Sequence, residues 1–259
     1  MFLSTQPLWL AILVVGFATL LAMAAPILIR RRIGLSRLRT NNEVAGFKFA
    51  TVGVLYAVLL AFAVIVVWEK FSDAENAVAQ EAGAAVTIYR LANGLGEPGT
   101  VVRNGLTGYI KSLVGDDWPA MERGGASHAS TAALNGVYTA VLTYSPSNAR
   151  DVAVLAETLR QLDALTQARR ARLVLAAGIV PEIIWLVLFG GALLTIGFTL
   201  FFGTENLPAQ AMMTGILSVL IFSGLLIIIV VDHPFAGTVR VRPEALIAVL
   251  DDFAVAPRP

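Results

Sequence analysis

The sequence predicts an all-α membrane protein, in which four transmembrane helices form two hairpins that flank a helical extramembrane domain. Composition is the first reason, because 57% of the 259 residues are hydrophobic and 14% are charged. Soluble domains usually carry about 25% charged residues. The mean hydropathy is +0.74. The apolar residues also gather in four blocks near the two ends of the chain, a pattern typical of membrane insertion.

The first hairpin is expected within residues 1–70, with spans at about 8–29 and 46–68. Each apolar stretch is long enough to cross a hydrocarbon core of roughly 30 Å as a helix. A cleaved signal peptide is the alternative for the first stretch, because Ala22-Met23-Ala24 has the form of a cleavage site. No basic residue precedes the apolar run, so we expect a span instead.

The second hairpin is expected within residues 173–231, with spans at about 181–202 and 211–231. Pro181 and Glu182 mark the start of its first span, since proline and an acidic residue both suit the first helical turn. Residues 232–259 are expected to form a short C-terminal tail. Tryptophans lie close to the span ends, as in interfacial belts, although tryptophan that packs in a core is an equally good interpretation. They are Trp9, Trp68 and Trp185.

Residues 71–172 are expected to form a soluble helical domain, because their apolar residues recur at intervals of three and four. Glycine- and proline-containing breaks at 94–99, 124–127 and 144–147 divide it into about four helices. Nothing between Trp68 and Leu91 interrupts the second span, so we expect it to continue into this domain as one long helix. The last helix of the domain is likewise expected to continue toward the third span.

Four spans place the N-terminus, the helical domain and the C-terminal tail on one side of the membrane. The loop between spans one and two is rich in arginine, and the positive-inside rule places that loop in the cytoplasm. Its arginines are Arg30, Arg31, Arg32, Arg37 and Arg39. The helical domain is then extracytoplasmic. The opposite orientation stays open, because five arginines flank the spans on the other side: Arg169, Arg170, Arg172, Arg240 and Arg242.

Several classes of function have no support in the sequence. There is no cysteine, and His128 and His233 lack carboxylates at metal-ligand spacing, so we expect no catalytic residue, metal or cofactor. The Asp232-His233 pair is better explained as a helix end before Pro234. No enzyme signature occurs, which predicts a protein that is not an enzyme. No basic tract suggests nucleic acid as a partner.

The interior of every span is free of ionisable residues, which disfavours a proton-coupled or ion-coupled transporter. The second span carries small residues four apart, Gly53, Ala57 and Ala61. Such a ridge lets another helix approach closely. That helix belongs either to the same chain or to another subunit.

A second stripe on the same span is apolar apart from one phenol, and it consists of Phe49, Val52, Tyr56 and Ala63. Apolar rings of this kind can gate a pore by dewetting when several subunits present them to one axis. We therefore take these four residues as pore-lining candidates, with a plain core or lipid-facing surface as the alternative. Lys48, Glu69 and Lys70 are candidates for charges at the pore mouth. Together they favour neither cation nor anion selectivity.

Several segments of the chain resemble a widespread family of bacterial membrane proteins known as bestrophin-like. The most specific is Asn42-Glu43-Val44-Ala45-Gly46-Phe47, which runs into Gly53-Val54-Leu55-Tyr56-Ala57-Val58. The others are Glu81 with Tyr89-Arg90, Asp117-Trp118-Pro119 with Met121 and Gly124, Arg169-Arg170-Ala171-Arg172, Asp232-His233-Pro234-Phe235-Ala236-Gly237, and Val241-Arg242-Pro243-Glu244. The resemblance spans nearly the whole chain and implies a multi-pass protein of the cell inner membrane.

The shared plan of two spans, a helical middle and two spans is also similar to that of bestrophins. These are pentameric anion channels whose second span lines a hydrophobic neck. This resemblance implies a homo-oligomer, a pentamer if it is followed fully, and a cytoplasmic middle region, which conflicts with the orientation that the arginines predict. The acidic calcium clasp of bestrophins has no counterpart beyond Asp251-Asp252, so calcium gating is not implied.

The leading hypothesis is a homo-oligomeric ion channel in the lipid bilayer, with the second span around the axis and ions as the permeant partners. The alternative is a non-conducting membrane scaffold or sensor whose helical domain binds a partner protein. Ion flux after reconstitution distinguishes the two hypotheses.

Overall fold

The structure, a computed structural model, describes residues 8–40 and 42–255, and every regular element in these ranges is helical. The chain divides into two compact units. The helices are α1 (Leu8–Arg32), α2 (Leu35–Arg39), α3 (Asn42–Ala92), η1 (Asn93–Leu95), α4 (Glu97–Ser112), η2 (Leu113–Asp117), α5 (Trp118–Met121), α6 (His128–Leu142), α7 (Ala149–Ala176), α8 (Glu182–Phe198), η3 (Thr199–Phe201), α9 (Leu207–Val231) and α10 (Glu244–Val255). The predicted all-α class with two membrane hairpins is confirmed.

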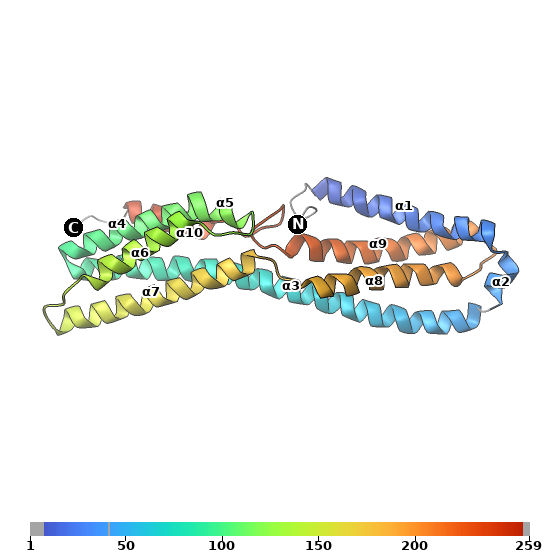
Figure 1. The fold of residues 1–259 in the computed structure, drawn as a ribbon, viewed down its shortest axis with the longest axis horizontal. Helices are drawn as coiled ribbons and strands as arrows, with labels where there is room; N and C mark the ends of the chain where they lie inside the picture. The colour runs from blue at the N-terminus through green and yellow to red at the C-terminus, as the bar shows by residue number, and fades with distance from the viewer. Residues whose placement is uncertain (1–7, 41, 256–259) are drawn as a thin grey trace. The chain divides into compact units, whose positions relative to one another are not determined.

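The membrane unit comprises the described residues up to Glu69 together with Ile179–Asp232. Four helices of the chain are long and apolar enough to cross a bilayer, namely α1, α3, α8 and α9. The first and last of these, α1 and α9, run side by side in opposite directions (Figure 1). A Cβ atom at Gly215 of α9 would lie 2.7 Å from Met23 Sδ, so α1 packs closely against the α9 backbone there.

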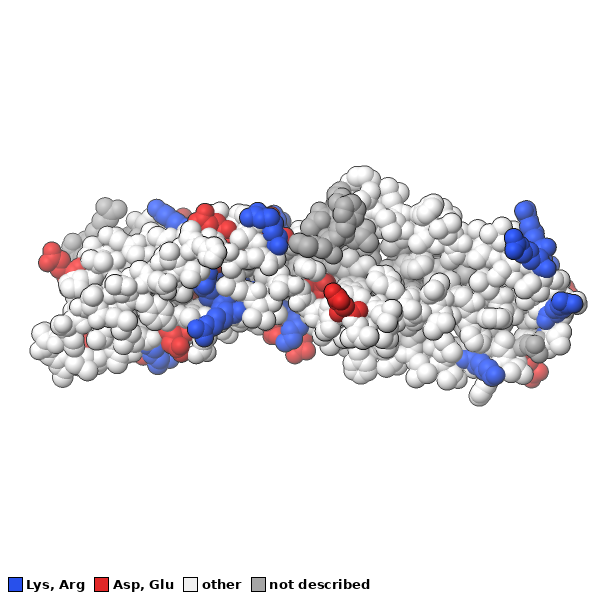
Figure 2. All heavy atoms as spheres, in the orientation of Figure 1, with Lys and Arg blue, Asp and Glu red and all other residues white. Residues whose placement is uncertain are grey.

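The surface of the membrane unit is apolar between its ends. Figure 2 shows that, on the face drawn, the charged side chains of this unit lie toward its ends and leave the region between them uncharged. Large apolar side chains that a soluble protein would bury are exposed on every span, such as Phe17 (65%), Leu186 (70%) and Leu220 (67%). Exposed apolar surface of this extent is stable in contact with lipid rather than water.

Polar contacts join the two loops at one end of the membrane unit. The Asn42 Nδ2 amide donates to the Gly203 carbonyl oxygen at 2.7 Å, and the Gly203 amide donates back to Asn42 Oδ1 at 3.0 Å. Arg39 also forms an ion pair with Glu205. Glycine is required at position 203, because a Cβ there would lie 2.6 Å from Leu38 Cβ. Asn42, the first residue of the family-like motif, therefore fastens one hairpin to the other.

The extramembrane unit comprises Lys70–Gly178 and the described residues from His233 onward. It contains the C-terminal part of α3, the antiparallel pair of α4 and α6, the long helix α7 and the C-terminal helix α10. The α10 helix packs on α4, and the ring of Phe253 stacks on Tyr89 with centroids 3.9 Å apart. Buried apolar residues from these helices form its core, including Ile88, Leu106, Ile110, Leu162 and Leu165.

Two expectations about helix continuity have different outcomes. The second span continues without interruption as α3, from Asn42 to Ala92, as expected. The expectation that the last domain helix continues into the third span is wrong. The α7 helix ends at Ala176, and α8 starts at Glu182. Gly178, with φ of +104°, turns the chain between them, and Asp232 Oδ1 accepts hydrogen bonds from the Ile179 and Val180 amides.

The C-terminal region also differs from the expectation of a plain tail, because residues 244–255 form the α10 helix. The loop between the first two spans contains the short helix α2. Asp232 follows the last residue of α9 and His233 lies in the turn after it, in agreement with a helix end at this pair.

Candidate functional site

The membrane part of α3 is largely exposed among the described residues. Only 11% of its most apolar stretch is buried, the same share as in α1, against 17% in α8 and 44% in α9. One side of the helix contacts α8 and α9. The rest of the helix surface is exposed, and it carries Val54, Leu55, Val58, Phe62 and Ile65 at 49% to 67% exposure. Of these, Leu55, Val58 and Phe62 also border a groove beside α8. A transmembrane helix with one unoccupied side faces either lipid or another subunit.

The stripe that contains the sequence-based pore candidates lies on the occupied side of α3. The Phe49 ring packs against Phe198 and Phe202, with centroids 5.8 and 5.6 Å away. The Tyr56 side chain is buried, and its hydroxyl donates to the Leu188 carbonyl oxygen at 3.0 Å.

Val52 and Ala63 are half-buried and share the occupied side with Phe49 and Tyr56. Phe49 and Tyr56 thus contact α8 of the same chain, and the pore-lining role of the stripe stays a prediction. The opposite side of α3 is exposed and free to face an axis between subunits.

Of the small residues of α3, Gly53 and Ala57 lie between these two sides, and Ala61 lies on the exposed side. Gly53 is half-buried, and no atom of the described residues lies within 4 Å of the position that a Cβ would take. Ala57 and Ala61 are exposed. Of the candidate mouth charges, Lys48 and Glu69 are exposed, whereas Lys70 forms an ion pair with Asp73 at 2.8 Å.

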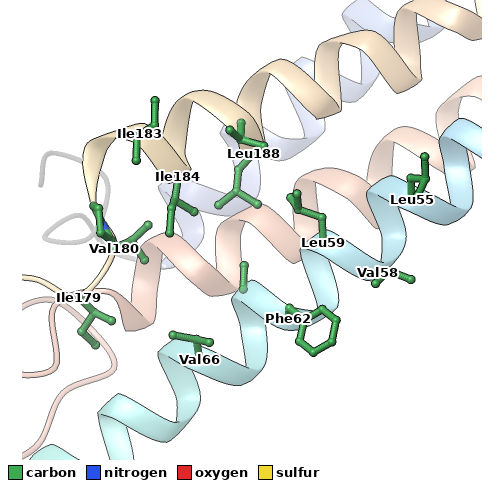
Figure 3. Close-up of a pocket in the computed structure, with 13 residues that line it drawn as sticks. Leu55, Val58, Leu59, Phe62, Val66, Ile179, Val180, Ile183, Ile184 and Leu188 are labelled. Atoms are coloured by element: carbon green, nitrogen blue, oxygen red, sulfur yellow. The ribbon is translucent and has the colours of Figure 1, made fainter.

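A groove of about 590 Å³ runs between α3 and the start of α8. It is lined by apolar residues of α3 between Leu55 and Val66 and by residues 179–188. Figure 3 shows Ile184 and Leu188 pointing from α8 toward α3. The lining contains no charged side chain, so the groove suits acyl chains or an apolar helix.

The family-like residues of the extramembrane unit meet in one buried cluster of charges. The Arg172 guanidinium has no exposed surface, and its Nε donates to Glu81 Oε2 at 2.7 Å. Its second terminal nitrogen donates to Asp117 Oδ2 at 3.0 Å. Tyr109 donates its hydroxyl proton to Glu81, and the Ser127 amide donates to Asp117 Oδ1 at 2.7 Å. Helices α3 and α7 and the π-helical turn η2 thus share one hydrogen-bonded ion cluster.

The geometry of this cluster depends on an irregular helix. Asp117 ends the π-helical turn that precedes Trp118 and Pro119, and proline cannot donate the regular helical hydrogen bond at that point. The turn places Asp117 next to Arg172. It also places the Trp118 ring near the guanidinium, with the ring centroid 5.4 Å from Arg172 Cζ. Phe235, from the family-like segment that runs from Asp232 to Gly237, packs edge-on against Trp118.

The burial of this cluster and its charges shift the pKa values of Arg172 and Tyr109. Burial acts to lower the pKa of Arg172, but the Glu81 carboxylate and the other acidic groups outweigh that effect and raise it. Burial, with Glu81 nearby, raises the pKa of the Tyr109 hydroxyl well above its usual value. The arginine therefore stays charged and the tyrosine neutral, so the cluster is suited to holding helices together rather than to proton transfer.

The sequence contains a signal that could have identified the occupied side of α3. A phenol hydroxyl in a low-dielectric environment needs a hydrogen-bond acceptor, and neither lipid nor a dry pore offers one. Tyr56 must therefore face protein. Within residues 8–40 and 42–255, no group of three or more His, Cys, Asp or Glu side chains could hold a metal ion.

Comparisons with known proteins agree with this architecture. The family model described as Bestrophin-like domain matches residues 8–246. A crystal structure of a bacterial bestrophin homologue from Klebsiella pneumoniae, carrying a point mutation, is similar at a TM-score of 0.72 and 15% identity, covering 93% of this chain and 99% of that one. A structure of the same homologue phased with zinc is similar at 0.66 and 16%, covering 92% and 94%. No curated protein matches the chain.

Proposed function

Because this chain belongs to the bestrophin-like family, we propose that it forms a homo-oligomeric ion channel in which α3 surrounds the pore. The family supports a channel-like role and not an enzymatic one. The observation that carries the proposal is the unoccupied, uncharged side of α3, which extends along the whole membrane span.

The residues assigned to the pore are Val54, Val58, Ala61 and Ile65, since intervals of four, three and four residues place them along one exposed line of α3. A ring of such side chains around an axis forms an apolar constriction that can gate by dewetting. The Gly53 and Ala57 positions lie beside this line and allow the α3 helix of a neighbouring subunit to approach closely. Glu69 and Lys48 would then lie toward the two ends of the pore.

The proposal can be tested with single cysteines, because the natural chain has none. The protein is reconstituted in liposomes, and ion flux is measured before and after a hydrophilic thiol reagent. We expect modification of Val58→Cys to block flux. Leu220→Cys on α9 is the matched control, because it is also exposed but lies on a helix outside the proposed pore, so its modification should leave flux unchanged.

Mass measurement of the reconstituted protein gives the number of subunits. A monomer, or liposomes with no flux, would contradict the channel and favour the non-conducting scaffold. Equal block at Val58→Cys and Leu220→Cys would instead contradict the assignment of the pore to α3.

A further inference from the structure

The membrane unit contains a buried face of uncharged polar side chains. Gln210, Thr214 and Ser218 follow one another at intervals of four on α9, and all three are buried. Helices α8 and α1 contribute Thr195 and Thr19, which are also buried. Five polar side chains are thus enclosed by apolar helices.

Three of these side chains have no partner for their hydroxyl groups. Thr19 Oγ1, Thr195 Oγ1 and Ser218 Oγ are buried, and none of them has a hydrogen-bond partner among the residues that the structure describes. Buried hydroxyls in proteins are nearly always satisfied, by protein or by water.

The register of the helices places these three hydroxyls at one level. Thr199 and Thr214 approach each other at 3.5 Å between their hydroxyl oxygens. Thr195 lies one turn before Thr199, and Ser218 lies one turn after Thr214. Because α8 and α9 are antiparallel, Thr195 and Ser218 lie at the same level. Met23 of α1 contacts Gly215 of α9, so one turn earlier on α1, Thr19 lies near the level of Ser218. Ser218 is 11 residues from the start of α9, which is roughly 16 Å at 1.5 Å per residue, or half of a membrane.

A cavity lies between this level and the loop end of the unit. It has a volume of about 290 Å³, and its polar lining includes Thr199, Thr204, Gln210 and Thr214. The Gln210 amide donates to the Phe202 carbonyl oxygen at 2.6 Å, which fixes the polar wall of the cavity. The rest of the lining is apolar, but a cavity of this size has room for several water molecules, and the four polar side chains offer them hydrogen-bond partners.

On the same face of α9, the residues beyond Ser218 are apolar. Ile221, Leu225 and Ile228 are buried there. The buried face of α9 is therefore polar up to Ser218 and apolar beyond it.

We propose that each subunit holds a water-filled half-channel, which enters from the loop end of the membrane unit and stops at Thr19, Thr195 and Ser218. Thr199 and Thr214 line the cavity, and water that extends one helical turn beyond them satisfies the hydroxyls of Thr19, Thr195 and Ser218. The apolar side chains beyond these hydroxyls keep the other half dry. The cavity itself is lined by α9, by residues between Thr199 and Thr204 and by Phe49 of α3, and the proposed extension lies among α1, α8 and α9. It does not depend on the proposed pore, because one subunit supplies all of its residues.

Cysteine accessibility tests this proposal in the full-length chain in nanodiscs, with aminoethyl methanethiosulfonate as the probe. Thr214→Cys and Ser218→Cys lie in the polar half, and Leu225→Cys is the matched control on the same face at similar burial. Because the thiolate is the reactive form and dry burial suppresses it, we expect both polar-half cysteines to react at least about tenfold faster than the control. Equal rates at Ser218→Cys and Leu225→Cys would overturn the proposal.

Thermal unfolding provides a second measurement that needs no reagent. Thr195→Val keeps the shape of the side chain and removes its hydroxyl. If water bridges the hydroxyls, the variant removes one hydrogen-bond partner of that water, and the Tm of the variant should be lower than that of wild type. If the hydroxyl is dry and unsatisfied, the same change removes an unfavourable group and Tm should rise, which would contradict the half-channel. Thr195→Ser, which keeps the hydroxyl, separates the loss of hydrogen bonding from the loss of volume.

Discussion

At the scale of single residues, Arg172 is a charged side chain that lies wholly within the core of the extramembrane unit. Its guanidinium contacts the carboxylates of Glu81 and Asp117 and the sulfur of Met121, and none of its side chain is exposed. Burying such a pair contributes little net stability, but removing one partner typically costs about 3–5 kcal/mol, since the other charge stays buried. The family-like residues of the extramembrane unit are therefore coupled as a set.

Tyr109 makes this cluster sensitive to alkaline pH. Its folded pKa is raised, whereas an unfolded tyrosine releases its proton near pH 10. Above that pH the unfolded state binds fewer protons than the folded one, so the stabilising contribution of the neutral tyrosine is lost as the pH rises. We expect wild type to be more stable than Tyr109→Phe at neutral pH, and the difference to shrink above about pH 10.

Chemical denaturation of both proteins across the pH range checks this expectation. Since each protein is compared with itself at neutral pH, other titrating groups cancel in the difference between the two curves. A difference that stays constant through the alkaline range would show that Tyr109 does not contribute through its proton.

At the scale of the helices, α3 and α8 are joined by one close contact. A Cβ at Gly191 would lie 2.5 Å from Tyr56 Cδ2, so the phenol ring packs directly on the α8 backbone. The Tyr56 hydrogen bond to the Leu188 carbonyl lies one turn away from Gly191. This contact fixes which side of α3 is turned inward, and it leaves the opposite side for lipid or another subunit.

Adjacent glycines on α8 provide a matched test of this contact. Gly191→Ala should destabilise the protein by about 1–3 kcal/mol, because the added methyl overlaps the Tyr56 ring. Gly190→Ala meets no atom within 4 Å and should be neutral or stabilising, as alanine is the better helix former. Thermal unfolding followed by tryptophan fluorescence measures both. Equal effects at the two positions would show that α3 and α8 do not pack as described.

At the scale of the whole molecule, the main functional question is the side of the membrane on which the extramembrane unit lies. The arginines on the loop side include Arg31, Arg32 and Arg37, which are exposed. On the other side, Arg172 belongs to the buried cluster and Arg240 pairs with Glu122. The loop-side arginines therefore remain the clearest orientation signal, and they predict an extramembrane unit outside the cytoplasm.

Reporter fusions test this orientation. Alkaline phosphatase, which is active only outside the cytoplasm, should be active when inserted after Ser145 and inactive when inserted after Arg32. A fluorescent protein that matures only in the cytoplasm should give the reverse pattern. The opposite result at both positions would place the extramembrane unit in the cytoplasm, as the resemblance to bestrophins implies.

Much of the architecture follows from local sequence. Long uncharged stretches require helices in a bilayer, and the uninterrupted run from Trp68 to Leu91 correctly predicts that α3 leaves the membrane as one helix. Local sequence does not predict the end of α7, because the turn at Gly178 depends on hydrogen bonds to the distant Asp232. It does not predict α10 either, because this helix is short and depends on packing against α4 and Tyr89.

The sequence by itself determined the membrane location, the hairpins and the choice of α3 as the helix of interest, because these depend on hydrophobic length and on helical periodicity. The tertiary structure decided which side of α3 is free, because the contacts of Phe49 and Tyr56 with α8 connect residues far apart in the chain, and in the sequence the Tyr56 hydroxyl is the one indication of that side. It also brought Glu81, Asp117 and Arg172 into one cluster and aligned the buried hydroxyls of three helices. These juxtapositions depend on helix register and packing, which periodicity within one segment does not specify.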